Sequence, residues 1–365
     1  MRNPVISAVA TLAAILAVSP ASAQPLGSAD PNHFGFSYRM GFNISASFKN
    51  LGGFAALTPQ TNPGRTPNND PFNYDNGYIF VDETAASHPG YTWYYGYVAA
   101  TPQRPAGTPT DFDLYRSSSA AQVTSKDRNG DPQHSFELTY NRQIGRFWHG
   151  FWGVEAGLGY TDIAIQDGRS LRATVTRVTD TYRTGGGAIL QPAPFFGTFQ
   201  GPPPSDPNGW PLVGLTPVAT STETLAGAAT ISGNRQFDAQ VASLRLGPYM
   251  EIPLNERWSV SLSLGLALLE VFSDFKFNET VSLDPSVTLA TLPGETHRAS
   301  GSNNDLLVGG FVAATISYAL NEHFKLFSGT QFQDVGNYTH VESGKKAVLD
   351  LSRSIFVTVG FGYSF

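Results

Sequence analysis

Residues 258–268 read Trp-Ser-Val-Ser-Leu-Ser-Leu-Gly-Leu-Ala-Leu, and they make up most of a segment that runs to Phe272. Every even position from Trp258 to Leu268 is large and apolar, whereas the odd positions are Ser, Gly or Ala. A period of two with one apolar face predicts a β-strand. The second face has almost no Lys or Glu, which the water-facing side of a soluble sandwich would carry. Small side chains suit a narrow, crowded barrel interior better.

The same alternation recurs along the chain. It is clear in residues 34–48 and 306–320, and weaker in 133–144, 147–165, 236–252, 324–341 and 345–365. Each segment reaches the roughly 9–11 residues that a tilted strand needs to cross a bilayer. The sequence therefore predicts an all-β fold, a transmembrane antiparallel up-and-down β-barrel of eight strands.

The connections alternate in length, as in outer-membrane barrels. Short turns are expected at 145–146, 253–257 and 321–323. Long extracellular loops are expected at about 49–132, 166–235 and 280–302, and a modest one near 342–346. An even strand number places both chain ends at the short-turn rim. Trp148, Trp152, Trp258, Phe324 and Tyr363 lie near that rim, where they predict an interfacial aromatic girdle.

The N-terminus predicts export. An apolar run follows Arg2 and ends in Pro20 and the small residues Ala21-Ser22-Ala23, which is typical of a cleaved signal peptide. We expect residues 1–23 to be removed and residues 24–365 to form the barrel. Composition agrees, since charged residues make up 14% of the 365 residues against roughly 25% in soluble proteins. The absence of Cys excludes disulfides and thiolate sites, and the net charge of −6 gives no reason to expect a nucleic-acid partner.

The end of the chain carries a resemblance to a known class. Residues 355–365 read Ile-Phe-Val-Thr-Val-Gly-Phe-Gly-Tyr-Ser-Phe. With the signal peptide and the eight strands, this ending resembles the small bacterial outer-membrane barrels of the OmpA, OmpX and OmpW kind, without an OmpA-type peptidoglycan-binding domain. The resemblance implies periplasmic termini, a barrel surrounded by outer-membrane lipid and lipopolysaccharide, and an ending recognised by the barrel-assembly machinery. The residues of that signature are Val359, Phe361, Tyr363 and Phe365.

Four charged residues fall on the face that points into the expected lumen: Arg39, Glu137, Glu155 and Arg245. Glu155 lies seven residues after Trp148, and Arg245 lies seven residues before Ile252 on the neighbouring strand, so both should reach the same height. We expect an ion pair between them. Buried charges are costly unless they are paired, and an eight-stranded lumen is just filled by side chains. A structural polar network is therefore favoured over a conduction path.

Two loop regions are candidates for recognition. The aromatic tract 74–97, with Trp93, Tyr94 and Tyr95, could bind sugar rings or hydrophobic ligands, or could pack on itself, which is favoured. The segment 167–177 could extend a strand and pair with a return limb at 217–232. Its arginines could clamp lipopolysaccharide phosphates, although a solvated hairpin face is favoured. They are Arg169, Arg172, Arg177 and Arg183.

No enzyme motif is recognisable. The seven histidines show no metal-binding or catalytic spacing, and neither a metal nor a cofactor is expected. Asp334 and His340 are the nearest approach to a dyad at the barrel rim. The sequence favours a structural or surface-interaction role without turnover. The alternatives are a narrow channel or OmpW-like transporter, which ten or twelve strands would favour if hairpins 78–98 or 171–231 joined the wall, and, less favoured, a hydrolase.

Overall fold

The computed structural model describes residues 32–57, 73–81, 89–98, 111–185, 193–197, 212–284 and 295–365. The expected signal segment 1–23 lies outside these ranges. The described residues form β-strands that pair antiparallel throughout, and none of them belongs to a helix able to cross a membrane.

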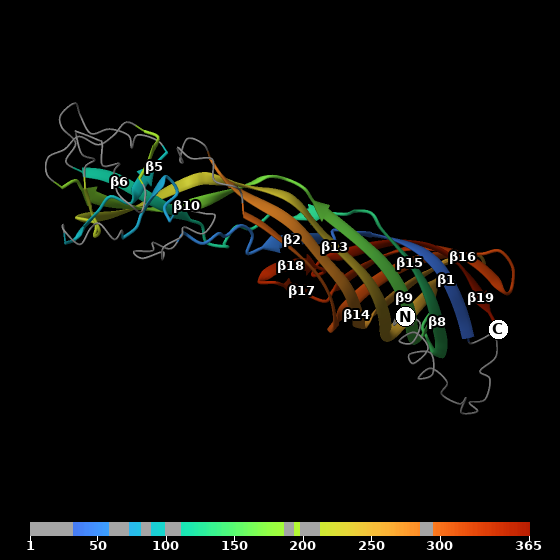
Figure 1. Ribbon diagram of the computed structural model, residues 1–365. Helices are drawn as coiled ribbons and strands as arrows, with labels where there is room; N and C mark the ends of the chain where they lie inside the picture. Colours follow the sequence, from blue (N-terminus) through green and yellow to red (C-terminus); the bar gives the residue numbers. More distant parts are fainter. Residues whose placement is uncertain are drawn as a thin grey trace.

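Eight strands close into a ring (Figure 1). In spatial order they are β14 (Trp258–Leu283), β15 (Glu295–Ala319), β16 (Phe324–Asp334), β19 (Ser354–Ser364), β1 (Asn32–Phe42), β8 (Gln133–Phe147), β9 (Gly150–Asp167) and β13 (Ala219–Pro253), which pairs again with β14. The predicted eight-stranded barrel is confirmed. A path through paired residues that starts at Asn32 returns to β1 at Phe42, ten residues further on. This stagger tilts the strands and leaves a lumen that side chains can fill.

The short turns and the described ends share one rim. The Phe365 amide donates to the Asn32 carbonyl at 3.0 Å, and β19 pairs with both β1 and β16. The first turn is not at 145–146 as predicted. A bulge near Ile144 absorbs Gly145, and β8 continues to Phe147, so that Trp148 occupies the turn with a positive φ of 42°.

The outer wall carries a belt of exposed apolar side chains, and strand β14 shows where it ends. Leu262, Leu264 and Leu266 point outward and are exposed, whereas from Leu269 onward the inward positions are buried and, apart from Ser273 and Glu279, apolar. The ten residue steps from Trp258 to Leu268, in a strand tilted by about 40°, cover about 26 Å of depth. That matches the roughly 25 Å apolar band of outer-membrane barrels.

Three strands expected to be continuous are each broken in two. The predicted strand 34–48 stops at Asn43, which has φ 60° and donates to the Asp131 carboxylate and the Arg353 carbonyl. The turn reverses the facing of the chain, so that Ile44 and Phe48 enter the interior instead of the lipid-facing wall. Segment 324–341 breaks at Gly336 (φ 75°), and segment 345–365 breaks at residues 351–353.

The limbs beyond these breaks form a second sheet, in the order β17 (Asn337–Glu342), β18 (Lys345–Asp350), β2 (Ser45–Lys49) and β7 (Arg128–Asn129). Its apolar side chains pack against the inner face of β9, β13 and β14 above the belt. Phe48, for example, stacks on Phe275 at a ring-centroid distance of 5.7 Å. We call this two-layer unit the cap.

An arm projects beyond the cap (Figure 1). The upper part of β13 pairs with β10 (Leu171–Arg183), which pairs with β6 (Asp111–Ser118), so the predicted hairpin between 167–177 and 217–232 is confirmed. Five short strands complete its tip: β3 (Gly77–Ile79), β4 (Tyr91–Thr92), β5 (Tyr95–Tyr97), β11 (Phe195–Phe196) and β12 (Val213–Gly214). Neither hairpin joins the ring. The described parts of the regions expected as loops at 166–235 and 280–302 are largely strand.

Candidate functional site

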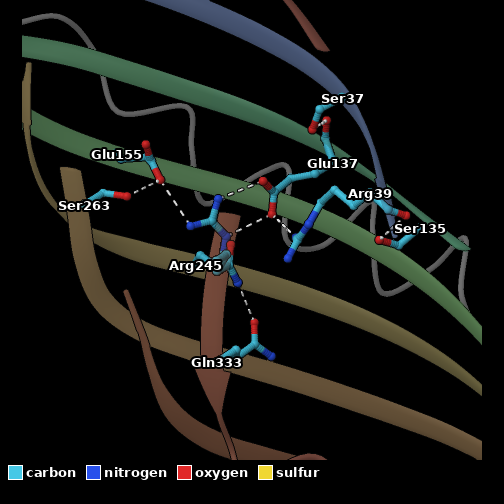
Figure 2. Close-up of polar contacts among 9 residues, drawn as sticks. Ser37, Arg39, Ser135, Glu137, Glu155, Arg245, Ser263 and Gln333 are labelled. Carbon is cyan, nitrogen blue, oxygen red and sulfur yellow. Dashed lines mark hydrogen bonds and ion pairs between the residues drawn. The ribbon is translucent and has the colours of Figure 1, made fainter. Parts of the chain in front are cut away.

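The four lumen charges meet in one network (Figure 2). Glu137 accepts from Arg245 at 2.9 Å (Nε) and 2.7 Å (Nη2), and also from Nη1 of Arg39. Nη1 of Arg245 lies 3.1 Å from Oε1 of Glu155, so the expected contact between these two residues is present. The Ser263 hydroxyl donates to the same oxygen at 3.2 Å. Their strands hold them together because β1, β8, β9 and β13 are successive neighbours in the ring.

Aromatic rings flank the two guanidinium groups. The Arg39 guanidinium lies 4.1 Å from the ring centroid of Phe356, and that of Arg245 lies 4.4 Å from the ring of Phe311. Both rings are buried. Cation–π contacts of this kind gain strength where water is excluded. The two arginines of the network are therefore stabilised by these aromatic contacts as well as by their ion pairs.

Free space differs on the two sides of the network. Toward the short-turn rim lies a polar cavity of about 60 Å³, whose lining includes Thr139, Ser261, Glu155 and Arg245. Toward the cap, a cavity of about 10 Å³ is lined by Arg39, Ile163, Leu269 and other residues. The first has room for several water molecules and the second for about one. Above it, the space between the two layers of the cap is filled by the apolar core.

A second buried ionic cluster lies in the cap, and the sequence analysis missed it. Glu279 is fully buried and accepts from Lys345 Nζ at 2.5 Å and from the Gly52 amide at 3.1 Å. Arg235, also fully buried, lies 3.8 Å from Glu279. The available signal was the alternation of the strand, because Glu279 continues the inward series of Phe275 and Phe277, in a stretch that the sequence analysis assigned to neither a strand nor a loop.

Most of the aromatic tract packs inward. Tyr94 and Tyr95 are buried and Trp93 is half-buried. Tyr95 packs against Phe195 at 5.1 Å, and Tyr94 packs edge-on against Tyr78 at 5.7 Å. The favoured interpretation, that these rings pack on one another, agrees with the geometry, and residues of the tract form the paired short strands β3 and β5.

The four loop arginines each lie beside a carboxylate of the chain itself. Arg169 pairs with Asp167 at 2.8 Å, Arg177 with Glu223 at 2.8 Å, Arg183 with Asp111 at 3.5 Å and Arg172 with Asp284 at 3.6 Å. Burial alone would raise the pKa of Asp167, but hydrogen bonds from Arg169 hold that pKa below its usual value. The arginines are spread along one strand and its entrance. They do not converge on a common point as a phosphate clamp would.

Asp334 and His340, the nearest approach to a rim dyad in the sequence, bind separate partners. Asp334 accepts from the Gly336 amide at 3.1 Å, whereas Nδ1 of His340 bonds the Ser273 hydroxyl at 2.8 Å. That hydroxyl also bonds Tyr338, and all three residues are buried in the cap. Burial lowers the pKa of His340 against the opposing effect of nearby Glu342 and Asp274. The strand break at Gly336 separates the two residues, since it turns β17 inward.

The girdle residues lie at the short-turn rim with exposed side chains. Trp148 is the most exposed at 94%. Phe324 packs on Tyr363 at 5.1 Å and Trp258 on Tyr318 at 4.9 Å, so Tyr318 is a member that the sequence analysis missed. Phe361, Val359 and Phe365 also point outward, on the strand that closes the ring. Among the residues described, no group of three or more His, Asp or Glu side chains could hold a metal ion.

Comparisons with known proteins give little guidance. No protein-family model matches the chain, and no curated protein matches it. Among solved structures, Ail, the attachment invasion locus protein of Yersinia pestis, is 8% identical with a TM-score of 0.29, over 93% of this chain and all of that one. The outer membrane protease OmpT of Escherichia coli is 9% identical with a TM-score of 0.33, over 94% and 100%. The toluene transporter TbuX of Ralstonia pickettii reaches 8% and 0.16, over 93% and 90%. Likenesses this weak carry no argument about role.

Proposed function

We propose that this protein is an outer-membrane barrel with a closed lumen, whose role is surface interaction carried by its extracellular cap and arm. The observation that carries the proposal is the sealed interior. Glu137 and Arg245 cross the lumen, and an apolar core lies above them. Much of the chain forms the cap and the arm, which lie above the apolar belt.

In this proposal the short-turn rim faces the periplasm, outer-membrane lipid surrounds the belt, and the barrel-assembly machinery acts on the strand ending at Phe365. A hollow of about 380 Å³ on the outer wall, lined by Phe36, Phe136, Leu158 and other apolar residues, would take lipid acyl chains. The chain is proposed to have no catalytic activity and to need no cofactor.

The test is conductance. The mature chain, refolded in detergent and inserted into a planar bilayer, is expected to give no single-channel current. Glu155→Ala, which removes a group on the cavity side of the network, should also stay silent because the cap core is untouched. Steady current through the unsubstituted protein that changes with Glu155→Ala or Arg245→Ala would overturn the proposal and favour a channel or transporter.

A further inference from the structure

Strand β15 extends far beyond one of its two neighbours. Its lower part pairs with β14 on one side and β16 on the other, and the pairing with β16 ends at Gly310, opposite Asp334. From Gly309 up to Glu295, β14 is its one ladder partner among the described residues. This length of strand therefore has one unpaired edge among the described residues.

The edge is open because of the break in the adjoining strand. At Gly336 the chain turns inward, and β17 pairs with β18 in the other layer of the cap. Tyr338 consequently reaches the inner side of β14, where its hydroxyl lies 2.7 Å from Ser273. Strand β17, which follows β16 in the chain, therefore lies in the inner layer of the cap and does not pair with β15.

The sequence of this edge lacks the usual protection. Exposed edges are normally guarded by Lys, Pro, bulges or a covering segment. Residues 299–304 are Ala-Ser-Gly-Ser-Asn-Asn, and their pairing with β14 has no register shift. Outside its ladder, the backbone of 295–305 makes one hydrogen bond with the described residues, which the Ser273 hydroxyl donates to the Asn303 carbonyl.

In the arm, the edge strand β6 differs from β15 because other residues of the chain bond to its backbone. Along β6 the Tyr115 carbonyl accepts from the Asp75 amide at 2.8 Å, and the Tyr115 amide donates to the Asn76 side chain at 3.0 Å. The Asn76 side chain also donates to the Asp113 carbonyl at 3.2 Å. The chain thus covers the edge of β6 with its own residues, whereas no strand among the described residues covers the upper edge of β15.

We propose that residues 295–305 of β15 bind an extended segment of another protein, which adds to the sheet as a further strand. This inference rests on the proposed surface-interaction role and names its site. Residues 306–309 are excluded because Leu306 and Val308 are exposed within the apolar belt, where lipid covers them.

Charge indicates the chemistry of the partner. Carboxylates lie at both ends of the edge, in Glu295 and Asp305, and the Glu342 carboxylate lies beside Gly301, where an added Cβ would be 1.9 Å from it. Arg298 is the single opposing Arg or Lys of the segment. A strand with uncharged, alternating side chains in its centre and basic residues at its ends complements this surface.

A second copy in the same membrane fits less well. Two copies in one bilayer are related by an axis along the membrane normal, which sets their β15 strands parallel. An antiparallel ladder between them would need opposing membranes. The proposal therefore commits to a segment of a different protein.

The probe is the capped peptide Lys-Thr-Val-Thr-Tyr-Thr-Val-Thr-Lys, with an alternately N-methylated version as its control. It is added to the full chain in detergent micelles, and binding is read by amide hydrogen exchange. We expect the amides within 295–305 to exchange at least tenfold more slowly with the peptide. The methylated peptide, which lacks the donors of one edge, should bind at least tenfold more weakly.

Single prolines at positions 300, 301, 302 and 303 supply the positional test. Proline is tolerated where the amide faces a free edge and disrupts where it pairs within the sheet. The variants in which proline replaces the residues with edge-facing amides, either 300 and 302 or 301 and 303, should keep the wild-type unfolding midpoint and lose peptide binding. Ser300→Ala should change neither the unfolding midpoint nor peptide binding. Equal binding by all folded proline variants or by the methylated peptide, no protection of 295–305, or dimers formed through this edge would each overturn the inference. If one of these outcomes is found and the protein still gives no single-channel current, the proposed function stands although this inference fails.

Discussion

Removal of Glu137 should destabilise the barrel more than any other single change in the lumen. Its carboxylate is buried and accepts from both Arg39 and Arg245. Glu137→Ala leaves two guanidinium groups facing each other without the anion between them. Breaking a buried ion pair by deleting one partner typically costs about 3–5 kcal/mol. We expect a loss in that range, since Glu155 can compensate Arg245 but does not contact Arg39.

The assay is urea unfolding of the protein in lipid vesicles, followed by the fluorescence of its five Trp residues. Glu155→Gln is the matched control. Glu155 has one ion pair and one hydroxyl contact, and its side chain is 13% exposed, so its loss should cost about 1 kcal/mol. Unfolding and refolding curves must coincide for the comparison to hold. A cost below about 1 kcal/mol for Glu137→Ala, or equal costs for the two variants, would refute the reasoning.

Three further predictions address the belt, the cap and the arm. Leu264→Arg should lower the free energy of unfolding in vesicles by about 2–4 kcal/mol, because Leu264 lies mid-belt with 59% exposure. The same urea unfolding measures this loss. An equal loss for Asn278→Arg, which lies above the belt, would contradict the prediction. Phe275→Ala, in the cap core, should lower the stability of the cap by about 3–5 kcal/mol and make the cap sensitive to protease while the barrel stays folded. A cap that resists protease as well as the barrel does would contradict this prediction. Burial raises the pKa of Asp75 to about 6, above its unfolded value near 4, so its ionised form costs stability at neutral pH and the cost fades as pH falls below about 6. Asp75→Asn should therefore stabilise β6 by up to about 3 kcal/mol at pH 7.5 and remove this pH dependence, as read by hydrogen exchange of β6; a destabilised arm would count against it.

The sequence was sufficient to find all eight wall strands because lipid and lumen make opposite demands on alternate residues. The same contrast allowed Glu155 and Arg245 to be placed at one height by counting from the turns. Arg39 and Glu137 were assigned to the lumen by the same parity, and the structure brings all four together.

Alternation alone could not reveal where strands leave the membrane. Ile44 and Phe48 have the same parity as Phe34 and Phe36, yet the left-handed turn at Asn43 sends them into the cap. In β14 the change is marked by adjacent Leu268 and Leu269, where the apolar series passes from even to odd positions. Glu279 and Arg235 were missed because neither lay within a predicted strand.

Strand β13 has a mechanical consequence. Its 35 residues run without interruption from the short-turn rim through the belt and cap into the arm. At about 3.3 Å per residue, the twenty-five steps from Leu244, which pairs with Leu268 at the top of the belt, to Ala219 span a contour of about 80 Å. The ladders of β13 with β14 and with β10 overlap at residues 229–231, and together they join the barrel wall to the arm, so that the arm stands at a set height above the apolar belt. A pulling force on the tip would be carried directly to the barrel wall.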